Sequence, residues 1–306
     1  MKPGSTILVI GATGAIGTQV IKSLLADEAN QWKIHALTRN PMSDRARTLK
    51  QMNPEKIRLV QGNNNDIGSI KEALENVQGV FCNTDYGSSG IQETQQGKKI
   101  IEAAKWKNIE FLVFLSLDHA TELSLNYVNV PHMDAKGEVE KTIKDRRKGG
   151  DAWFQRHCAV LTTVPYMENF MGKLKPSYED GKYIFKLPLK EKPFPLVALE
   201  DIGWFTAFLF ANQQRFQGKT IKIAGESLTG TEIAQKFAEA THQSAIYQDV
   251  EGLGVKESDK QFEFIRDYGL DRDYEYLKGI HPELKTFKRW LTDTGWQGEE
   301  RQIEKA

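Results

Sequence analysis

Residues 7–17 read Ile7-Leu8-Val9-Ile10-Gly11-Ala12-Thr13-Gly14-Ala15-Ile16-Gly17 and join an apolar run to three spaced glycines. The run does not alternate with polar residues, which is typical of a parallel strand buried on both faces. Apolar residues recur at helical spacing from residue 18 onward, so the glycines connect a strand to a helix. In that context the first glycine allows a tight turn, the second a close approach of a pyrophosphate, and the third close packing of the helix on the sheet. The alternative is a turn that is rich in glycine for structural reasons alone.

Strands and helices continue to alternate from this loop to residue 164. Short apolar runs predict strands at 34–38, 57–60, 80–83, 111–117 and 159–164. Helical spacing predicts helices around 70–74, 93–104 and 136–147. Because each parallel strand needs a crossover helix to return, we predict an α/β fold built on a Rossmann doubly wound parallel sheet.

The alternation breaks after Pro165, where proline, lysine and aromatic residues accumulate. A helix at 202–210 and a strand at 220–223 resume the pattern, and a helix at 232–240 follows the capping candidates Thr229 and Thr231. We expect the apolar residues after it, among them Leu284 and Trp290, to belong to helices that cover a smaller α/β lobe. The predicted domains are therefore a Rossmann domain at 1–165, with 196–225 returning to it, and a lobe at 166–195 and 226–306.

The composition excludes several classes of partner. The 306 residues carry 41 basic and 41 acidic side chains, so no global field attracts nucleic acid and no direct nucleic-acid partner is expected. The longest apolar runs are far shorter than the ~18 residues of a membrane helix, so no membrane partner is expected. Cys82 and Cys158 stand in unrelated segments, which favours a reducing, cytoplasmic compartment. No histidine has a partner at metal-ligand spacing, so no metal is expected, and a homodimer is left open.

The end of the predicted second strand reads Thr38-Arg39-Asn40. Folds of this kind place an acid there to bind the ribose 2′-hydroxyl of NAD(H), and this chain has none. A guanidinium suits a 2′-phosphate by its charge and bidentate geometry, and Arg45 lies within reach, so we predict NADP(H) as the cofactor. The alternative is a surface arginine without a ligand. Gly62-Asn63-Asn64-Asn65-Asp66 follows the third strand and is interpreted either as a contact to adenine or as an Asx-rich turn.

Further segments carry a family likeness. They are Thr38-Arg39-Asn40-Pro41, Gln61-Gly62, His132-Met133-Asp134-Ala135-Lys136-Gly137-Glu138-Val139-Glu140, Tyr166-Met167-Glu168-Asn169-Phe170 and Asp201-Ile202-Gly203. Together with the glycine loop they resemble the NmrA-like family of atypical short-chain dehydrogenases/reductases, over nearly the whole chain. The resemblance implies a Rossmann domain, a smaller lobe, and NADP(H) in the cleft between them.

The resemblance also implies contacts along the cofactor. By matching positions, the residues at the phosphates would be Gly11, Thr13, Gly14, Ala15, Ile16 and Gly17, with Thr38, Arg39 and Asn40 around the 2′-phosphate. The remaining contacts would be Asn63 and Asn64 at the adenine, Thr84 at the ribose side, Lys136 at the nicotinamide ribose, and Tyr166 and Asn169 at the nicotinamide end and the substrate cleft.

Catalysis depends on what replaces a missing tyrosine. Ordinary short-chain reductases use Tyr-x-x-x-Lys, in which the tyrosine protonates the substrate and the lysine lowers the tyrosine pKa. Here His132 stands four residues before Lys136, in the place of the tyrosine. A histidine is a competent acid near neutrality, although the sensing members of the family share such a substitution. Otherwise His132 packs in the interior or supports the residues that contact the ligand, and Lys136 is a solvated lysine on a charged helix face.

Two functions therefore stay open. The first is a redox sensor or regulatory module that binds NADP(H) and presents different surfaces to a regulatory protein partner. The second is an NADPH-dependent oxidoreductase that reduces a small carbonyl, quinone or imine-like substrate, with His132 and Lys136 as catalytic residues.

Overall fold

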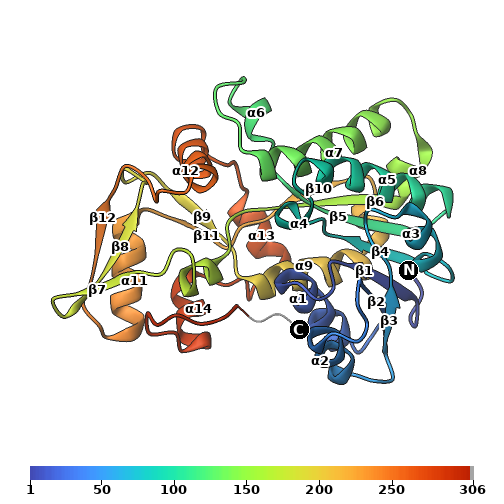
Figure 1. Cartoon of the computed structure of the whole chain (residues 1–306), viewed down its shortest axis with the longest axis horizontal. Coiled ribbons are helices and arrows are strands. Elements are labelled where there is room, and N and C mark those ends of the chain that lie inside the picture. The colour runs from blue at the N-terminus through green and yellow to red at the C-terminus, as the bar shows by residue number, and fades with distance from the viewer. Residues whose placement is uncertain (304–306) are drawn as a thin grey trace.

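The computed structural model describes residues 1–303, and its larger part is a seven-stranded sheet (Figure 1). The strand order is β10-β6-β5-β4-β1-β2-β3, and every neighbouring pair is parallel. The order reverses at β1, which is the place where such sheets bind dinucleotides. The strands are β1 Thr6–Ile10, β2 Lys33–Thr38, β3 Ile57–Gln61, β4 Gly79–Cys82, β5 Phe111–Leu117, β6 Cys158–Thr163 and β10 Thr220–Lys222.

Helices cover both faces of this sheet. They are α1 Ala15–Ala26, α2 Asp44–Met52, α3 Ile67–Ala73, α4 Tyr86–Ser89, η1 Gly90–Gln92, α5 Glu93–Trp106, α6 Ala120–Leu123, α7 Pro131–Lys148, α8 Ala152–His157, α9 Leu199–Ala211, α10 Gln213–Phe216 and α13 Tyr274–Ile280. Successive side chains of a strand point to opposite faces. Ile7 and Val9 of β1 accordingly lie in the core that α1 and α9 cover, whereas Leu8 and Ile10 lie in the core that α3, α5 and α7 cover. The predicted doubly wound fold is confirmed.

A smaller α/β lobe lies beside the sheet along the long axis of the molecule (Figure 1). It holds a three-stranded sheet of order β12-β8-β7 and the antiparallel pair β11-β9. Its elements are η2 Met167–Met171, β7 Ser177–Glu179, β8 Lys182–Leu187, β9 Phe194–Leu196, β11 Glu226–Leu228, α11 Gly230–Thr241, β12 Ala245–Asp249, α12 Lys256–Tyr268 and α14 Phe287–Thr294. Its core is aromatic, with Phe170 and Phe185 in edge contact and Trp290 stacked on Phe287.

Several local expectations need correction. The helix predicted from Lys136 begins earlier, at Pro131, whose fixed backbone angle suits the first turn. Leu284 packs in the core of the larger domain, together with Leu277 of α13, and not in the lobe. The capping prediction for Thr229 is confirmed, because Thr229 and Glu232 form a reciprocal capping box. None of the helices within residues 1–303 is long and apolar enough to cross a bilayer. The domain boundaries stay predictions.

Candidate functional site

Two glycines at the loop between β1 and α1 stand at positions with no room for a side chain. Gly11 has a φ of +82°, which favours glycine, and a Cβ there would lie 2.8 Å from the carbonyl oxygen of Asn83. A Cβ on Gly17 would lie 2.2 Å from the carbonyl oxygen of Gly11. These approaches bring β4, the loop and α1 together at the carboxyl edge of the sheet. Glycine is therefore required at both positions for this close packing.

The N-terminus of α1 has the properties of an anion site. Gly14 is its N-cap, and no side chain of the described residues caps it. By contrast, Ser43 caps α2 and Asp66 caps α3 by accepting from backbone amides. An uncapped first turn leaves N–H groups and a positive dipole end for a phosphate. Thr13, Ala15 and Ile16 flank this terminus and are half-buried.

Arg39 lies at a cavity of about 420 Å³ on the β2–β3 side of the same edge. The cavity is lined by Arg39, Gln61, Gly62, Asn63, Asp66, Ser69 and Glu72. Arg39 is exposed and forms no ion pair or hydrogen bond with any residue between 1 and 303. An exposed guanidinium without a partner is available to an anion, whereas Asp66 and Glu72 in the same lining repel one.

The polar side chains around this cavity also shape the loops. Thr38 Oγ1 accepts from the Asn40 amide at 3.3 Å, and Asn40 Oδ1 accepts from the amide of Met42 at 2.9 Å. Asn63 Oδ1 accepts from the Asn65 amide at 3.0 Å, which is an Asx turn. Asn64 is half-buried beside it. The turn reading of this segment is thus correct, and its contact to adenine stays a prediction.

A buried polar cluster lies at the end of β4. Lys136 Nζ donates to Thr84 O at 2.7 Å, to Thr84 Oγ1 at 3.1 Å and to Asn83 Oδ1 at 3.0 Å, and Glu93 Oε1 lies 3.1 Å away. Thr84 Oγ1 in turn donates to Glu93 Oε1 at 2.7 Å. The Lys136 side chain is 11% exposed and that of Glu93 0%, so the reading of Lys136 as a solvated lysine is wrong. Glu93 was not identified from the sequence.

His132 connects the Rossmann domain to the lobe. Its Nδ1 lies 2.6 Å from Oε1 of Glu257, a residue of the first turn of α12, and its backbone amide donates to the same oxygen at 3.3 Å. The rings of His132 and Tyr86 lie 6.5 Å apart. Burial lowers the pKa of His132 below its ordinary value, and the Glu257 carboxylate opposes that shift. His132 therefore contacts both domains, and its role as an acid stays a prediction.

Tyr166 and Asn169 follow β6 at the same edge. Tyr166 is half-buried, and burial raises the pKa of its phenol. Asn169 is 5% exposed, yet its carboxamide makes no hydrogen bond with the rest of residues 1–303. Glu168 between them accepts from the Leu199 amide and from the Trp290 indole, and burial raises its pKa to about 7. This carboxylate joins the lobe to the start of α9.

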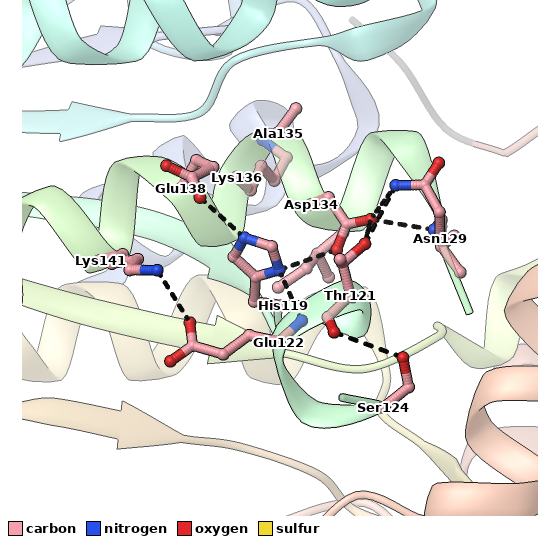
Figure 2. A network of polar contacts seen from close by, with 12 residues as sticks. His119, Thr121, Glu122, Ser124, Asn129, Asp134, Ala135, Lys136, Glu138 and Lys141 are labelled. Carbon is pink, nitrogen blue, oxygen red and sulfur yellow. Dashed lines mark hydrogen bonds and ion pairs between the residues drawn. The ribbon is translucent and has the colours of Figure 1, made fainter. Parts of the chain in front are cut away.

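The loop between β5 and α7 is fixed by Asp134 (Figure 2). The Asp134 carboxylate accepts from the Thr121 amide at 2.8 Å, from the Asn129 side chain at 2.7 Å and from the Val130 amide at 3.0 Å. His119 Nδ1 lies 2.9 Å from Asp134 Oδ1. The network holds the start of α7, and with it His132, relative to the sheet.

These features fit a dinucleotide. The tightly packed glycines and the uncapped helix suit a pyrophosphate, and the exposed guanidinium of Arg39 lies at the β2–β3 end of the same edge. Thr84, Lys136, Tyr166 and Asn169 lie toward the β4–β6 half of the edge, on the other side of the glycine loop from Arg39. Among the described residues, no group of three or more His, Cys, Asp or Glu side chains could hold a metal ion.

Known proteins similar to this chain include a sequence relative and two solved structures. An NmrA-like family domain-containing protein of Dictyostelium discoideum is 23% identical over 297 residues, which are 93% of this chain and 96% of that protein. NmrA, a negative transcriptional regulator solved in complex with NADP, is similar with a TM-score of 0.77 and 18% identity over 95% of each chain. The NADPH-dependent quinone oxidoreductase QOR2 from Escherichia coli, solved with NADPH, is similar with a TM-score of 0.76 and 20% identity, over 95% of this chain and 100% of that one.

The solved structures are only 18% and 20% identical to this chain, so they support its fold alone. The family assignment comes from the sequence itself, since the family model described as the NmrA-like family matches residues 3–277. That range includes the glycine loop, the Lys136 cluster and the His132–Glu257 contact. The chain belongs to the NmrA-like family.

Proposed function

We propose that this protein binds NADP(H) and acts as a redox sensor or regulatory module for a protein partner. The observation that carries the cofactor assignment is Arg39, an exposed guanidinium without a partner among residues 1–303, at the cavity beside the glycine loop. Asp66 and Glu72 line the same cavity, so a phosphate there depends on Arg39 for its counter-charge. The NADP complex of NmrA and the NADPH complex of QOR2 support the same cofactor.

The sensing role is supported by what stands in place of the catalytic tyrosine. His132 already holds a carboxylate partner from the lobe, and the Lys136 ammonium has protein acceptors for all of its protons. Both side chains thereby connect the cofactor edge to other parts of the molecule. A sensor needs a ligand to bind one conformation more tightly than another, and contacts between two domains are where such a difference arises.

A reductase is the second candidate, and one observation favours it. An imidazole held at Nδ1 by a carboxylate has a fixed orientation, and its Nε2 is then available to protonate a substrate oxygen. The bound cofactor would supply the hydride, while the chain supplies position and the exclusion of water. The likeness to a quinone oxidoreductase makes quinones the first substrates to test, followed by small carbonyls and imine-like compounds.

Calorimetry with the wild type and two variants tests the cofactor assignment. Arg39→Ala should weaken NADPH binding by roughly 1 to 3 kcal/mol, the range for a charged hydrogen bond, and leave NADH nearly unaffected. Arg47→Ala is the matched control, because Arg47 is an exposed arginine of α2 that pairs with Asp44. Equal losses for the two nucleotides would refute the assignment.

An oxidation assay separates the two roles. The pure protein is incubated with NADPH and a panel of quinones and carbonyls while the absorbance of the reduced nicotinamide is followed. Turnover that disappears in His132→Ala, with NADPH binding retained, would establish a reductase. Tight NADPH binding without turnover supports the sensor.

A further inference from the structure

The contact between His132 and Glu257 joins the two domains at a partly exposed position. His132 stands on the first turn of α7, and Glu257 stands on the first turn of α12. The two are joined twice, through the ring nitrogen at 2.6 Å and the backbone amide at 3.3 Å, both to one carboxylate oxygen. The His132 side chain is 25% exposed and that of Glu257 41%, so solvent and ligands still reach the pair.

The position of this pair relative to a cofactor follows from the fold. The pyrophosphate belongs at the N-terminus of α1, and the adenine half then lies over β2 and β3, where Arg39 stands. The nicotinamide half of a dinucleotide extends over the other half of the sheet edge. Lys136, one turn of α7 beyond His132, contacts the end of β4 on that side. We therefore expect the nicotinamide half of a bound dinucleotide to lie on the side of the sheet edge where His132 stands.

The two redox forms of the cofactor differ there by one charge. The nicotinamide ring of NADP⁺ is a cation, whereas that of NADPH is neutral, and the phosphates are common to both. A cation close to an imidazole disfavours its protonated form. The charged or titratable groups that face His132 are Glu257 of α12, Lys173 after η2, Glu93 of α5 and the phenol of Tyr86 of α4. Glu257 and Glu93 favour the imidazolium form of His132, and Lys173 opposes it. A further cation, such as the ring of NADP⁺, would also oppose the imidazolium form.

We propose that His132 and Glu257 form a specificity-determining pair, which lets this protein distinguish NADPH from NADP⁺ by the charge of the nicotinamide ring. The proposal rests on the proposed NADP(H) binding. When His132 is neutral, the negative charge of Glu257 is uncompensated and favours the cationic ring of NADP⁺. When His132 is protonated, its imidazolium neutralises Glu257, so NADP⁺ loses this advantage relative to NADPH.

Thermodynamic linkage relates the pKa of His132 in the two complexes to the affinities for NADPH and NADP⁺. If NADP⁺ lowers the pKa of His132 by about one unit relative to NADPH, the ratio of the two dissociation constants changes tenfold across the titration. The dissociation constant of NADP⁺ rises relative to that of NADPH as the pH falls through the pKa of His132. Titration of the 2′-phosphate, which occurs near pH ~6 for a phosphate ester, affects both nucleotides alike and cancels in the ratio.

Binding of both nucleotides to the full chain between pH 8 and pH 5 provides the test. The wild type should show the roughly tenfold change in the ratio, and His132→Gln should show a ratio independent of pH. Glu257→Gln should move the change to lower pH, because the carboxylate that favours the imidazolium is removed. His157→Gln is the matched control, since His157 stands before β6 at the opposite edge of the sheet and should behave as the wild type.

Nuclear magnetic resonance of the wild type gives a readout that needs no variant to fold. The chain has 6 histidines, so ¹³C-labelled imidazoles can be titrated individually. The pKa of His132 should be about one unit lower in the NADP⁺ complex than in the NADPH complex. Equal pKa values and a constant affinity ratio would overturn the inference while leaving NADP(H) binding intact. Failure of both nucleotides to bind would overturn the proposed function and the inference together.

Discussion

Replacing Lys136 by methionine tests the role of the buried cluster at the end of β4. The substitution keeps the length of the side chain but removes the cation beside Glu93, whose side chain is 0% exposed. Glu93 Oε2 has no hydrogen-bond partner even in the wild type, so Oε1 and its contacts with Lys136 and Thr84 stabilise the whole carboxylate. Removing one member of a buried ion pair costs about 3 to 5 kcal/mol, because the remaining charge is uncompensated.

The assay is urea unfolding of Lys136→Met, of Glu93→Gln and of the double variant. We expect each single variant to lose about 3 to 5 kcal/mol in the free energy of unfolding, and the double variant to lose much less than the sum. Lys175→Met is the control, because its pair with Glu300 is exposed and such pairs contribute about 0 to 1 kcal/mol. A Lys136→Met variant as stable as the control, or additive losses in the double variant, would refute the coupling.

Two further predictions concern the glycine loop and the loop before α7. Gly17→Ala should abolish nucleotide binding and destabilise the chain, since its Cβ would lie 2.2 Å from a carbonyl oxygen; calorimetry and urea unfolding measure both, and unchanged binding would contradict the prediction. The hydrogen bond to Asp134 raises the pKa of His119 above 6.5, so the stabilisation by this pair is complete below about pH 6.5 and is lost as the pH rises through the raised pKa. Hydrogen exchange of residues 119–130 should therefore speed up above that pKa, once corrected for the intrinsic pH dependence. An Asp134→Asn variant should show a smaller step at lower pH, because only Glu138 then pairs with His119.

The local features of the fold could be predicted because they depend on residues close in sequence. The glycine loop, the strand before it and the helix after it all lie within residues 6–26, where spacing alone carries the signal. The same holds for Thr229 and Glu232, which form their capping box within one turn. The family likeness added positions that spacing could not supply, such as Tyr166 and Asn169.

The contacts that define the site could not be predicted, because they join distant parts of the chain. His132 and Glu257 are 125 residues apart, and neither has a neighbour in sequence that indicates the other. Glu93 stands in the first turn of an amphipathic helix, where acidic residues are common, so the sequence does not single it out. Only the fold brings Glu93 next to Lys136. In the lobe, β7 has 3 residues and β8 pairs with β12 across a long separation, so neither gives a clear pattern.

The helix α2 was missed for a different reason. Its buried face consists of Ala46 and Leu49 alone, which is too little for a recognisable apolar period. Its cap, Ser43, could have indicated a start, since Ser43 accepts from the Ala46 amide. Leu284 was assigned to the wrong core because it stands between α13, which packs on the larger domain, and α14, which packs in the lobe, and its sequence neighbours indicate neither.

Direct comparison of NADPH and NADH binding by calorimetry on the wild type tests the central claim. A 2′-phosphate held by Arg39 predicts saturable binding of NADPH at least about tenfold tighter than that of NADH, which corresponds to ~1.4 kcal/mol. Equal affinities would contradict the role of Arg39. The absence of binding by NADPH and NADP⁺ alike would contradict the account as a whole.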